Sequence, residues 1–301
     1  MNDIFKIVSL YCFSSIAKKK LFNLKDKLQK FEDKELTGLV ILAEEGINGT
    51  ICGKENVVSI FHREVKNFLR DQDLNEKISF SEKKIFKKLK IKIKAEIVTM
   101  GIHGISPEKK SGIYVDSEEW NDLLSDNNTI VIDTRNHYEV SLGSFENAIN
   151  PNLKNFREFP EWLDKNLKRI TNNNEDINIA MFCTGGIRCE KATSLLLERG
   201  YQNTYHLKGG ILKYLENVPS IRNKYKGECY VFDERVSLDN NLKKGSYSIC
   251  HACGMPLSEE DMKKLHYIEG VQCHYCIEKF TDTDRARFAE RQKQIEDKIE
   301  Q

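Results

Sequence analysis

The sequence contains no apolar run long enough to cross a lipid bilayer. Its first residues, MNDIFKIVSLYC, lack the basic segment and the small-residue cleavage site of a secretory signal. We also find no internal repeat, no low-complexity linker, no flavin fingerprint, no haem motif and no facial triad of iron ligands. The first two absences predict a cytoplasmic protein with no membrane partner.

The chain is long enough for two or three domains, with 301 residues of which 40% are hydrophobic and 31% are charged. Nine residues are cysteines. Because the cytosol keeps thiols reduced, we expect these cysteines to serve metal binding or catalysis rather than a disulfide framework. Cys12, Cys52 and Cys229 have no partner at a suitable spacing, and we expect them to pack in the interior.

Charge is unevenly distributed along the chain. Residues 1–110 carry 22 Lys and Arg against 15 Asp and Glu, a net charge of +7, whereas residues 111–301 carry a net charge of −6. A basic segment joined to a mildly acidic one indicates that the first segment faces a polyanion. A lysine-rich face that serves only solubility is the alternative.

The N-terminal segment, residues 1–110, has the pattern of a small α+β domain. Runs typical of strands and helices alternate at 5–13, 21–31, 38–43 and 57–70. The stretch EEGINGTICG, residues 44–53, contains an Asn-Gly pair and predicts a tight turn into a further strand. With the last strand placed within residues 87–100, the order β-α-β-β-α-β predicts a ferredoxin-like domain.

That last strand carries a row of lysines. The pattern K-L-K-I-K-I-K begins at Lys88, and the row consists of Lys88, Lys90, Lys92 and Lys94. Because successive side chains on a strand point to opposite faces, these lysines share one face at a spacing of about 6.6 Å. Ammonium groups at this spacing can follow a phosphate backbone, which predicts RNA binding. The alternative is a charged face that protects the edge of a sheet.

The middle segment, residues 111–218, also alternates strands and helices, but its strands are continuous apolar runs such as TIVID and NIAMF. This pattern predicts an α/β domain with a parallel sheet covered on both faces. In such sheets ligands bind at the carboxyl ends of the strands. Asp133, with Arg135 after it, and Cys183 lie at two such ends, so we expect them at the active site.

Cys183 lies at the corner between a predicted strand and a predicted helix. It is followed by Thr184, Gly185, Gly186, Ile187 and Arg188. A helix N-terminus and a nearby cation lower the pKa of a cysteine, and the glycines let backbone N–H groups turn toward the sulfur. We therefore expect a catalytic thiolate at Cys183, assisted by Arg188. A buried packing cysteine is the alternative, and Cys189 is either a resolving thiol or a small core residue.

The C-terminal segment, residues 219–301, contains two cysteine pairs and ends in a charged helical run over 284–301. Nineteen residues separate Cys250-x2-Cys253 from Cys273-x2-Cys276. This spacing is typical of a structural zinc site that four thiolates close tetrahedrally. The alternatives are four reduced thiols or a redox-active pair. His251 and His274 lie within the cysteine pairs and are expected to point outward rather than to bind metal.

Several motifs resemble known families. Cys-Thr-Gly-Gly-Ile-Arg, with Asp133-Thr134-Arg135 upstream, resembles the active-site loop of the rhodanese superfamily. Related phosphatases place the arginine one residue later, so the tighter loop favours a persulfide sulfur over a phosphate. Six stretches together resemble the bacterial tRNA uridine(34) 5-hydroxylases, a rhodanese-domain family: LAEEGINGTICG, DTRNHYEVSLGSFENAINP, FREFPEW, CTGGIRCEKA, HLKGGILKYLE and KGECYVFDERVSL.

This resemblance implies oxygen-dependent hydroxylation of the wobble uridine at C5. It implies tRNA rather than DNA as partner, O2 as co-substrate, and Cys183 as the active-site residue, for which a persulfide is proposed in the family. Two other functions stay open. One is a sulfurtransferase that passes a persulfide to a thiol or to tRNA. The other is a non-catalytic module that binds RNA or protein through zinc knuckles, against which the intact Cys183 loop argues.

Overall fold

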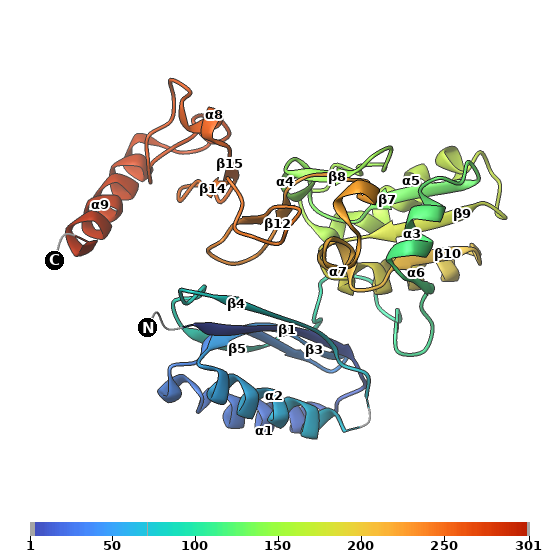
Figure 1. Cartoon of the computed structure of the whole chain (residues 1–301), viewed down its shortest axis with the longest axis horizontal. Helices are drawn as coiled ribbons and strands as arrows, with labels where there is room; N and C mark the ends of the chain where they lie inside the picture. Colours follow the sequence, from blue (N-terminus) through green and yellow to red (C-terminus); the bar gives the residue numbers. More distant parts are fainter. Residues whose placement is uncertain (1–3, 71, 300–301) are drawn as a thin grey trace.

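The structure, a computed structural model, describes residues 4–70 and 72–299. Residues 1–3 at the start of MNDIF and residues 300–301 at the end of the predicted charged helix lie outside this description. Within the described ranges, no helix is long and apolar enough to cross a membrane. The chain builds two separate sheets, followed by a C-terminal segment of short hairpins and one long helix (Figure 1).

The first sheet, here called the N-terminal sheet, has the strand order β4-β1-β3-β2-β5. Its elements are β1 (Phe5–Phe13), α1 (Lys18–Gln29), η1 (Glu32–Lys34), β2 (Thr37–Ala43), β3 (Gly46–Gly53), α2 (Glu55–Leu69), β4 (Asn75–Ser81) and β5 (Leu89–Ile93). The first four strands and the two long helices have the β-α-β-β-α-β order that the sequence predicts, and β1, β2, β3 and β4 pair antiparallel. The ferredoxin-like interpretation is therefore confirmed.

The identity of the last strand differs from the prediction. β4, with the sequence NEKISFS, completes the motif beside β1, whereas the lysine-bearing β5 is a fifth strand that pairs parallel to β2 at the opposite edge. The alternation of β5 is strong because Leu89 and Ile91 reach the core. The seven residues of β4 include just two apolar ones, Ile78 and Phe80, so its alternation is weak in the sequence. Both side chains are exposed, at 44% and 58%.

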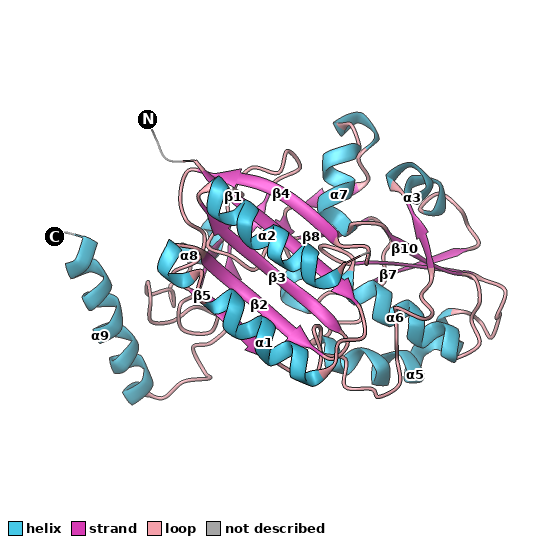
Figure 2. Ribbon diagram, turned by 90° about the horizontal axis from the view of Figure 1, so that it is seen from below, coloured by secondary structure: helices cyan, strands magenta, loops and turns pink. Residues whose placement is uncertain are grey.

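Both long helices cover one face of the N-terminal sheet (Figure 2). Their buried residues recur three and four positions apart, at Leu21, Leu24 and Leu28 in α1 and at Val58, Phe61, Val65 and Leu69 in α2. The opposite face carries the alternate residues of β1, including Ile7, Tyr11 and Phe13, which are also buried. Around β1 this second face is covered by residues 85–86, 97–98 and 187, and the later part of the chain lies on this side of the sheet in Figure 1.

The second sheet, here called the middle sheet, is parallel with the order β6-β10-β9-β7. Its strands and covering helices are β6 (Ile113–Val115), α3 (Ser117–Leu123), β7 (Thr129–Asp133), α5 (Phe159–Ile170), β9 (Asn178–Phe182), α6 (Ile187–Glu198), β10 (Thr204–Leu207) and α7 (Gly210–Asn217). One core joins the sheet to α5 and α6, and another joins it to α3 and α7. The predicted doubly covered parallel sheet is therefore confirmed.

Short elements complete the chain: α4 (His137–Val140), β8 (Gly143–Phe145), η2 (Phe156–Glu158), η3 (Ser220–Arg222), β11 (Tyr225–Gly227), β12 (Cys229–Tyr230), β13 (Ser237–Leu238), β14 (Ser248–Ile249), β15 (Pro256–Leu257), α8 (Glu259–Met262) and α9 (Asp282–Ile299). β11 pairs with β8 beside the middle sheet. In Figure 1, β12 lies beside α4 and above the N-terminal sheet, and α9 extends away from both sheets.

Candidate active site

Cys183 immediately follows β9 at the carboxyl end of the middle sheet, and α6 begins four residues later. We call residues 183–188 the Cys183 loop. The backbone N–H of Gly186 donates to the Cys183 Sγ at 3.1 Å, as expected for a loop that turns its amides toward a sulfur anion. Gly186 adopts a φ of +102°, in a region that favours glycine. The thiol itself is fully buried, whereas Thr184 and Gly185 are half-buried.

The loop stabilises the thiolate form of Cys183. Burial alone raises the pKa of this thiol, but the neighbouring Cys189 thiol, the positive charge of Arg188 and the backbone N–H groups of Arg188 and Gly186 together lower it to about 5. Burial and the adjacent Cys183 thiolate raise the pKa of Cys189, which therefore stays protonated. Cys183 is the group of this pair that can act as a nucleophile near neutral pH.

Arg188 is held by a buried carboxylate that sequence reasoning did not identify. Its two terminal nitrogens donate to the two carboxylate oxygens of Glu139 at 2.7 and 2.6 Å. Burial lowers the pKa of Arg188, but the ion pair with Glu139 outweighs it, so that the guanidinium stays charged. Glu139 lies in the quoted stretch DTRNHYEVSLGSFENAINP, but the sequence does not show that it pairs with a residue 49 positions away.

A second glycine-containing segment, at the start of α7, is hydrogen-bonded to the backbone of the Cys183 loop. The backbone N–H groups of Ile211 and Leu212, at the start of α7, donate to the carbonyls of Cys183 and Thr184 at 2.9 and 3.1 Å. Gly210 adopts a φ of +64°, and a Cβ there would lie 2.5 Å from the Cys183 carbonyl oxygen. This close backbone approach explains the glycine pair in HLKGGILKYLE.

Asp133 and Arg135 lie at the end of β7 but form a structural pair. Both are fully buried, and the Arg135 guanidinium donates to the Asp133 carboxylate at 2.6 and 2.9 Å and to the Gly143 carbonyl at 2.6 Å. Ser144 donates to the same carboxylate at 2.9 Å. These bonds fix the turn between β7 and β8, on which Glu139 is carried. Asp133 and Arg135 thus act on the Cys183 loop through the backbone that positions Glu139.

The N-terminal sheet contacts the loop directly. The Tyr11 hydroxyl, on the face opposite the helices, donates to the Glu190 carboxylate at 2.7 Å. A Cβ on Gly186 would lie 2.8 Å from the same hydroxyl, and Ile187 packs against the hydrophobic cluster that contains Tyr11 and Phe13. Burial raises the pKa of Glu190 to about 7, although bonds from Tyr11 and Tyr114 oppose the shift. Glu190 is thus a buried acid beside a thiolate.

Lys191 reinforces the same boundary from the next position of α6. It is 2% exposed and pairs with Glu45 at 2.8 Å and with Glu96 at 2.6 Å, both from the N-terminal part of the chain. Lys77 of β4 reaches the other way and donates to the Leu212 carbonyl at 2.7 Å. Tyr11, Glu190 and Lys191 were not identified from the sequence. Their partners lie far away along the chain, so no local spacing of residues indicates these contacts.

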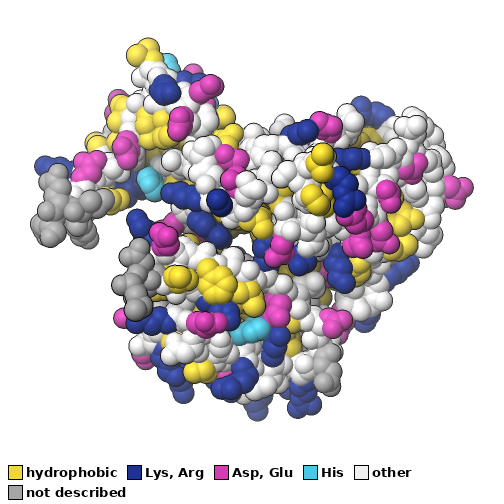
Figure 3. Space-filling model, in the orientation of Figure 1, with side chains coloured by type: hydrophobic (Ala, Val, Ile, Leu, Met, Phe, Trp, Pro, Cys, Tyr) yellow, Lys and Arg dark blue, Asp and Glu magenta, His cyan; other side chains and the backbone are white. Residues whose placement is uncertain are grey.

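The lysine row is exposed at the edge of the N-terminal sheet. Lys90 and Lys92 lie within β5, in register with Leu39 and Ile41 of β2, while Lys88 and Lys94 flank the strand. All four side chains are exposed. They alternate with Leu89 and Ile91, which face the helices, so the row belongs to the opposite face. Figure 3 shows a hollow between the N-terminal part and the rest of the molecule, with Lys and Arg side chains along its border.

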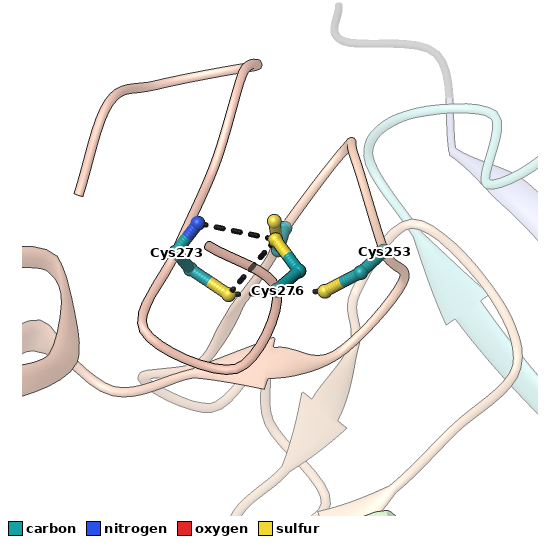
Figure 4. Close-up of side chains that lie close together, drawn as sticks. Cys253, Cys273 and Cys276 are labelled. Carbon is teal, nitrogen blue, oxygen red and sulfur yellow. Dashed lines mark hydrogen bonds between the residues drawn. The ribbon is translucent and has the colours of Figure 1, made fainter. Parts of the chain in front are cut away.

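The four paired cysteines converge in the C-terminal segment. Their sulfur atoms all lie within 4.8 Å of one another, with Sγ–Sγ distances of 3.7 Å for Cys253–Cys273 and 3.8 Å for Cys273–Cys276 (Figure 4). A zinc ion bound to four sulfurs at about 2.3 Å requires sulfurs about 3.8 Å apart. This cluster, completed by Cys250, can therefore bind a metal ion. His251 is exposed and His274 lies near Asp261, consistent with the expectation that neither is a ligand.

Comparisons with known proteins agree with this architecture. Residues 5–97 match the family described as the UPF0176 acylphosphatase-like domain, and residues 116–217 match the rhodanese-like domain. A tRNA uridine(34) hydroxylase of Prochlorococcus marinus strain MIT 9515 is 60% identical over 292 residues, covering 97% of this chain and 94% of its own. The protein with the same name from P. marinus subsp. pastoris is 58% identical over 295 residues, covering 98% and 95%. Because these matches span both sheets, the Cys183 loop and the cysteine cluster, the chain belongs to the tRNA uridine(34) hydroxylase family.

Proposed function

We propose that this protein hydroxylates the wobble uridine of tRNA at C5, with O2 as co-substrate and Cys183 as the catalytic residue. The observation that carries the proposal is the Cys183 loop. A low-pKa thiol, an arginine oriented by a buried carboxylate and an inward-facing amide meet beside a second domain that bears a basic face. The names of the relatives supply the substrate and the reaction class.

In this proposal three segments divide the work. Residues 111–218 carry the chemistry, and Arg188 keeps Cys183 ionised, as a thiolate or as a persulfide. Residues 1–110 hold the tRNA backbone, with Lys88, Lys90, Lys92 and Lys94 contacting phosphates without reading sequence. Residues 219–301 bind one structural zinc through the four cysteines, which leaves no open coordination position for substrate. Because tRNA is the substrate and the chemistry needs a reduced thiol, the proposed enzyme works in the cytoplasm.

The Cys183 loop also supports a second function. A sulfurtransferase would use the same thiolate to carry a persulfide to a thiol or to tRNA, and the short spacing between Cys183 and Arg188 suits a single sulfur atom. Mass analysis of tRNA nucleosides from cells that lack this protein separates the two functions. Loss of 5-hydroxyuridine derivatives supports the hydroxylase, whereas loss of a thiolated nucleoside with intact hydroxylation supports the sulfurtransferase.

A further inference from the structure

The hairpin formed by β12 and β13 has a tightly bound tip. The backbone N–H of Val231 donates to the Val236 carbonyl at 2.9 Å, and Val236 adopts a φ of +64°. Between them, the Arg235 guanidinium donates to both carboxylate oxygens of Asp233 at 2.9 and 2.6 Å. These bonds hold the tip in one conformation.

Phe232 is the exposed residue of this tip. Its side chain is 59% exposed, whereas Tyr230, Val231 and Val236 are between 5% and 7% exposed. The ring packs edge-on against Tyr230 with a centroid distance of 5.1 Å. A rigid backbone thus presents a large apolar ring to solvent, and burying that ring against a ligand would be favourable.

The ring stands beside the Cys183 loop. The guanidinium carbon of Arg188 lies 6.0 Å from the Phe232 ring centroid, and the same guanidinium is bound to Glu139. Glu234, two residues after Phe232, donates its backbone N–H to the Ile85 carbonyl of the N-terminal part at 3.4 Å. Phe232 therefore lies where the Cys183 loop, the hairpin and the N-terminal part meet.

From this position we infer that Phe232 is the stacking platform for the target pyrimidine base of the tRNA. Proteins that recognise unpaired RNA bases stack them on aromatic side chains, and Phe232 offers an exposed ring 6.0 Å from the buried guanidinium of Arg188, which belongs to the Cys183 loop. A base in an anticodon loop is unpaired and can be turned outward onto such a surface. This inference rests on the proposed function and adds a base-binding residue to it.

The test measures the affinity of two proteins, wild type and Phe232→Ala, for two anticodon stem-loop RNAs. One RNA is intact, and the other is abasic at the target position. Stacking on one ring is worth about 5- to 150-fold in affinity. We expect Phe232→Ala and the abasic RNA each to weaken binding by an amount in this range. We expect the double change to weaken it no further than either change alone, because both remove the same contact. Phe232→Trp should retain affinity.

Phe80→Ala is the matched control, since Phe80 is an equally exposed phenylalanine, at 58%, on β4. It should bind both RNAs as wild type does. Thermal unfolding verifies that the variants fold. Independent, multiplying penalties from Phe232→Ala and the abasic site would overturn the platform while leaving tRNA as the substrate. Wild-type protein that shows no preference for the RNA over a DNA of the same sequence would overturn the proposed function as well.

Discussion

The Tyr11 hydroxyl donates to the Glu190 carboxylate at 2.7 Å, and this bond joins a strand of the N-terminal sheet to a helix of the middle segment, 179 positions away. Tyr11 belongs to β1, and Glu190 lies in the first turns of α6, directly behind the Cys183 loop. Lys191 beside it pairs with Glu45 and Glu96. The helix that follows Cys183 is therefore also the helix that docks the N-terminal sheet, through the polar contacts of Glu190 and Lys191.

This contact should make stability depend on pH. Burial raises the pKa of Glu190 from 4.5 to about 7, so the folded protein holds this proton more tightly than the unfolded chain. The contribution of this proton to the free energy of unfolding is fully present below pH 4.5. It is lost as the pH rises through 7, by about 3 kcal/mol in total. Glu190→Gln should remove this loss, as measured by denaturant unfolding between pH 5 and 8. Glu198→Gln, at an exposed position of the same helix, should keep it; equal slopes in wild type and Glu190→Gln would contradict the assignment.

Gly210→Ala should distort the Cys183 loop. Both Gly210 and Gly200 adopt positive φ, where an alanine costs roughly 1–2 kcal/mol. Only at Gly210 would the new Cβ also meet the backbone of Cys183 and Thr184, at 2.5 and 2.6 Å, whereas no atom lies within 4 Å at Gly200. We expect both variants to lose stability, but only Gly210→Ala to change the rate at which Cys183 is alkylated. An unchanged alkylation rate in Gly210→Ala would show that the loop tolerates the displacement.

Replacing the lysine row by glutamine should weaken tRNA binding and flatten its salt dependence. Each phosphate contact contributes about −0.7 to −0.9 to the slope of log K against log salt, so loss of four contacts should reduce the slope by about 3. The control replaces four other exposed lysines by glutamine, on or beside α1: Lys18, Lys19, Lys20 and Lys30. It removes the same amount of charge, but from the helix side of the domain. If both quadruple variants lower the slope equally, the row has no special place in RNA binding.

The cysteine cluster should bind about one zinc per chain, by the four-ligand rule. Cys276→Ala should release the metal, loosen the C-terminal segment and leave the alkylation rate of Cys183 unchanged, because the hydrophobic cluster around the cysteines is built, among the described residues, from residues 250–280. Cys52→Ala, which removes a buried cysteine of the N-terminal sheet, should retain the zinc. Metal analysis of the purified variants, together with proteolysis of the C-terminal segment, decides the matter; full metal content in Cys276→Ala would be incompatible with this site.

Local patterns in the sequence predicted those parts of the structure that depend on neighbours in the chain. The alternation around Leu89 and Ile91 predicted a strand, and the spacing of the four cysteines predicted their convergence. The predicted tight turn into a further strand is also present, at Glu44–Glu45. The Asn48-Gly49 pair, which is typical of such a turn, lies instead within β3. Gly49 is required there because a Cβ would lie 2.7 Å from the Leu39 carbonyl oxygen on the neighbouring strand.

Contacts between distant segments could not be predicted in this way. Arg188 was identified from its place after Cys183, but its partner Glu139 comes from the short helix α4, which follows β7. Asp133 and Arg135 were expected at the active site from their place at a strand end, but their bonds to each other and to the Gly143 carbonyl in the interior could not be read from the sequence. A buried charge needs a partner of opposite charge, yet which partner it finds depends on the folded topology.

The most direct test of the account is the origin of the oxygen that reaches the wobble uridine. Cells that lack the chromosomal gene are supplied with wild-type protein or with Cys183→Ser, grown under ¹⁸O2, and their tRNA nucleosides are analysed by mass. The account predicts 5-hydroxyuridine derivatives that carry one ¹⁸O in cells with wild-type protein and none of these derivatives in cells with Cys183→Ser. Labelled product at the wild-type level in cells with Cys183→Ser would contradict the central role of this thiol.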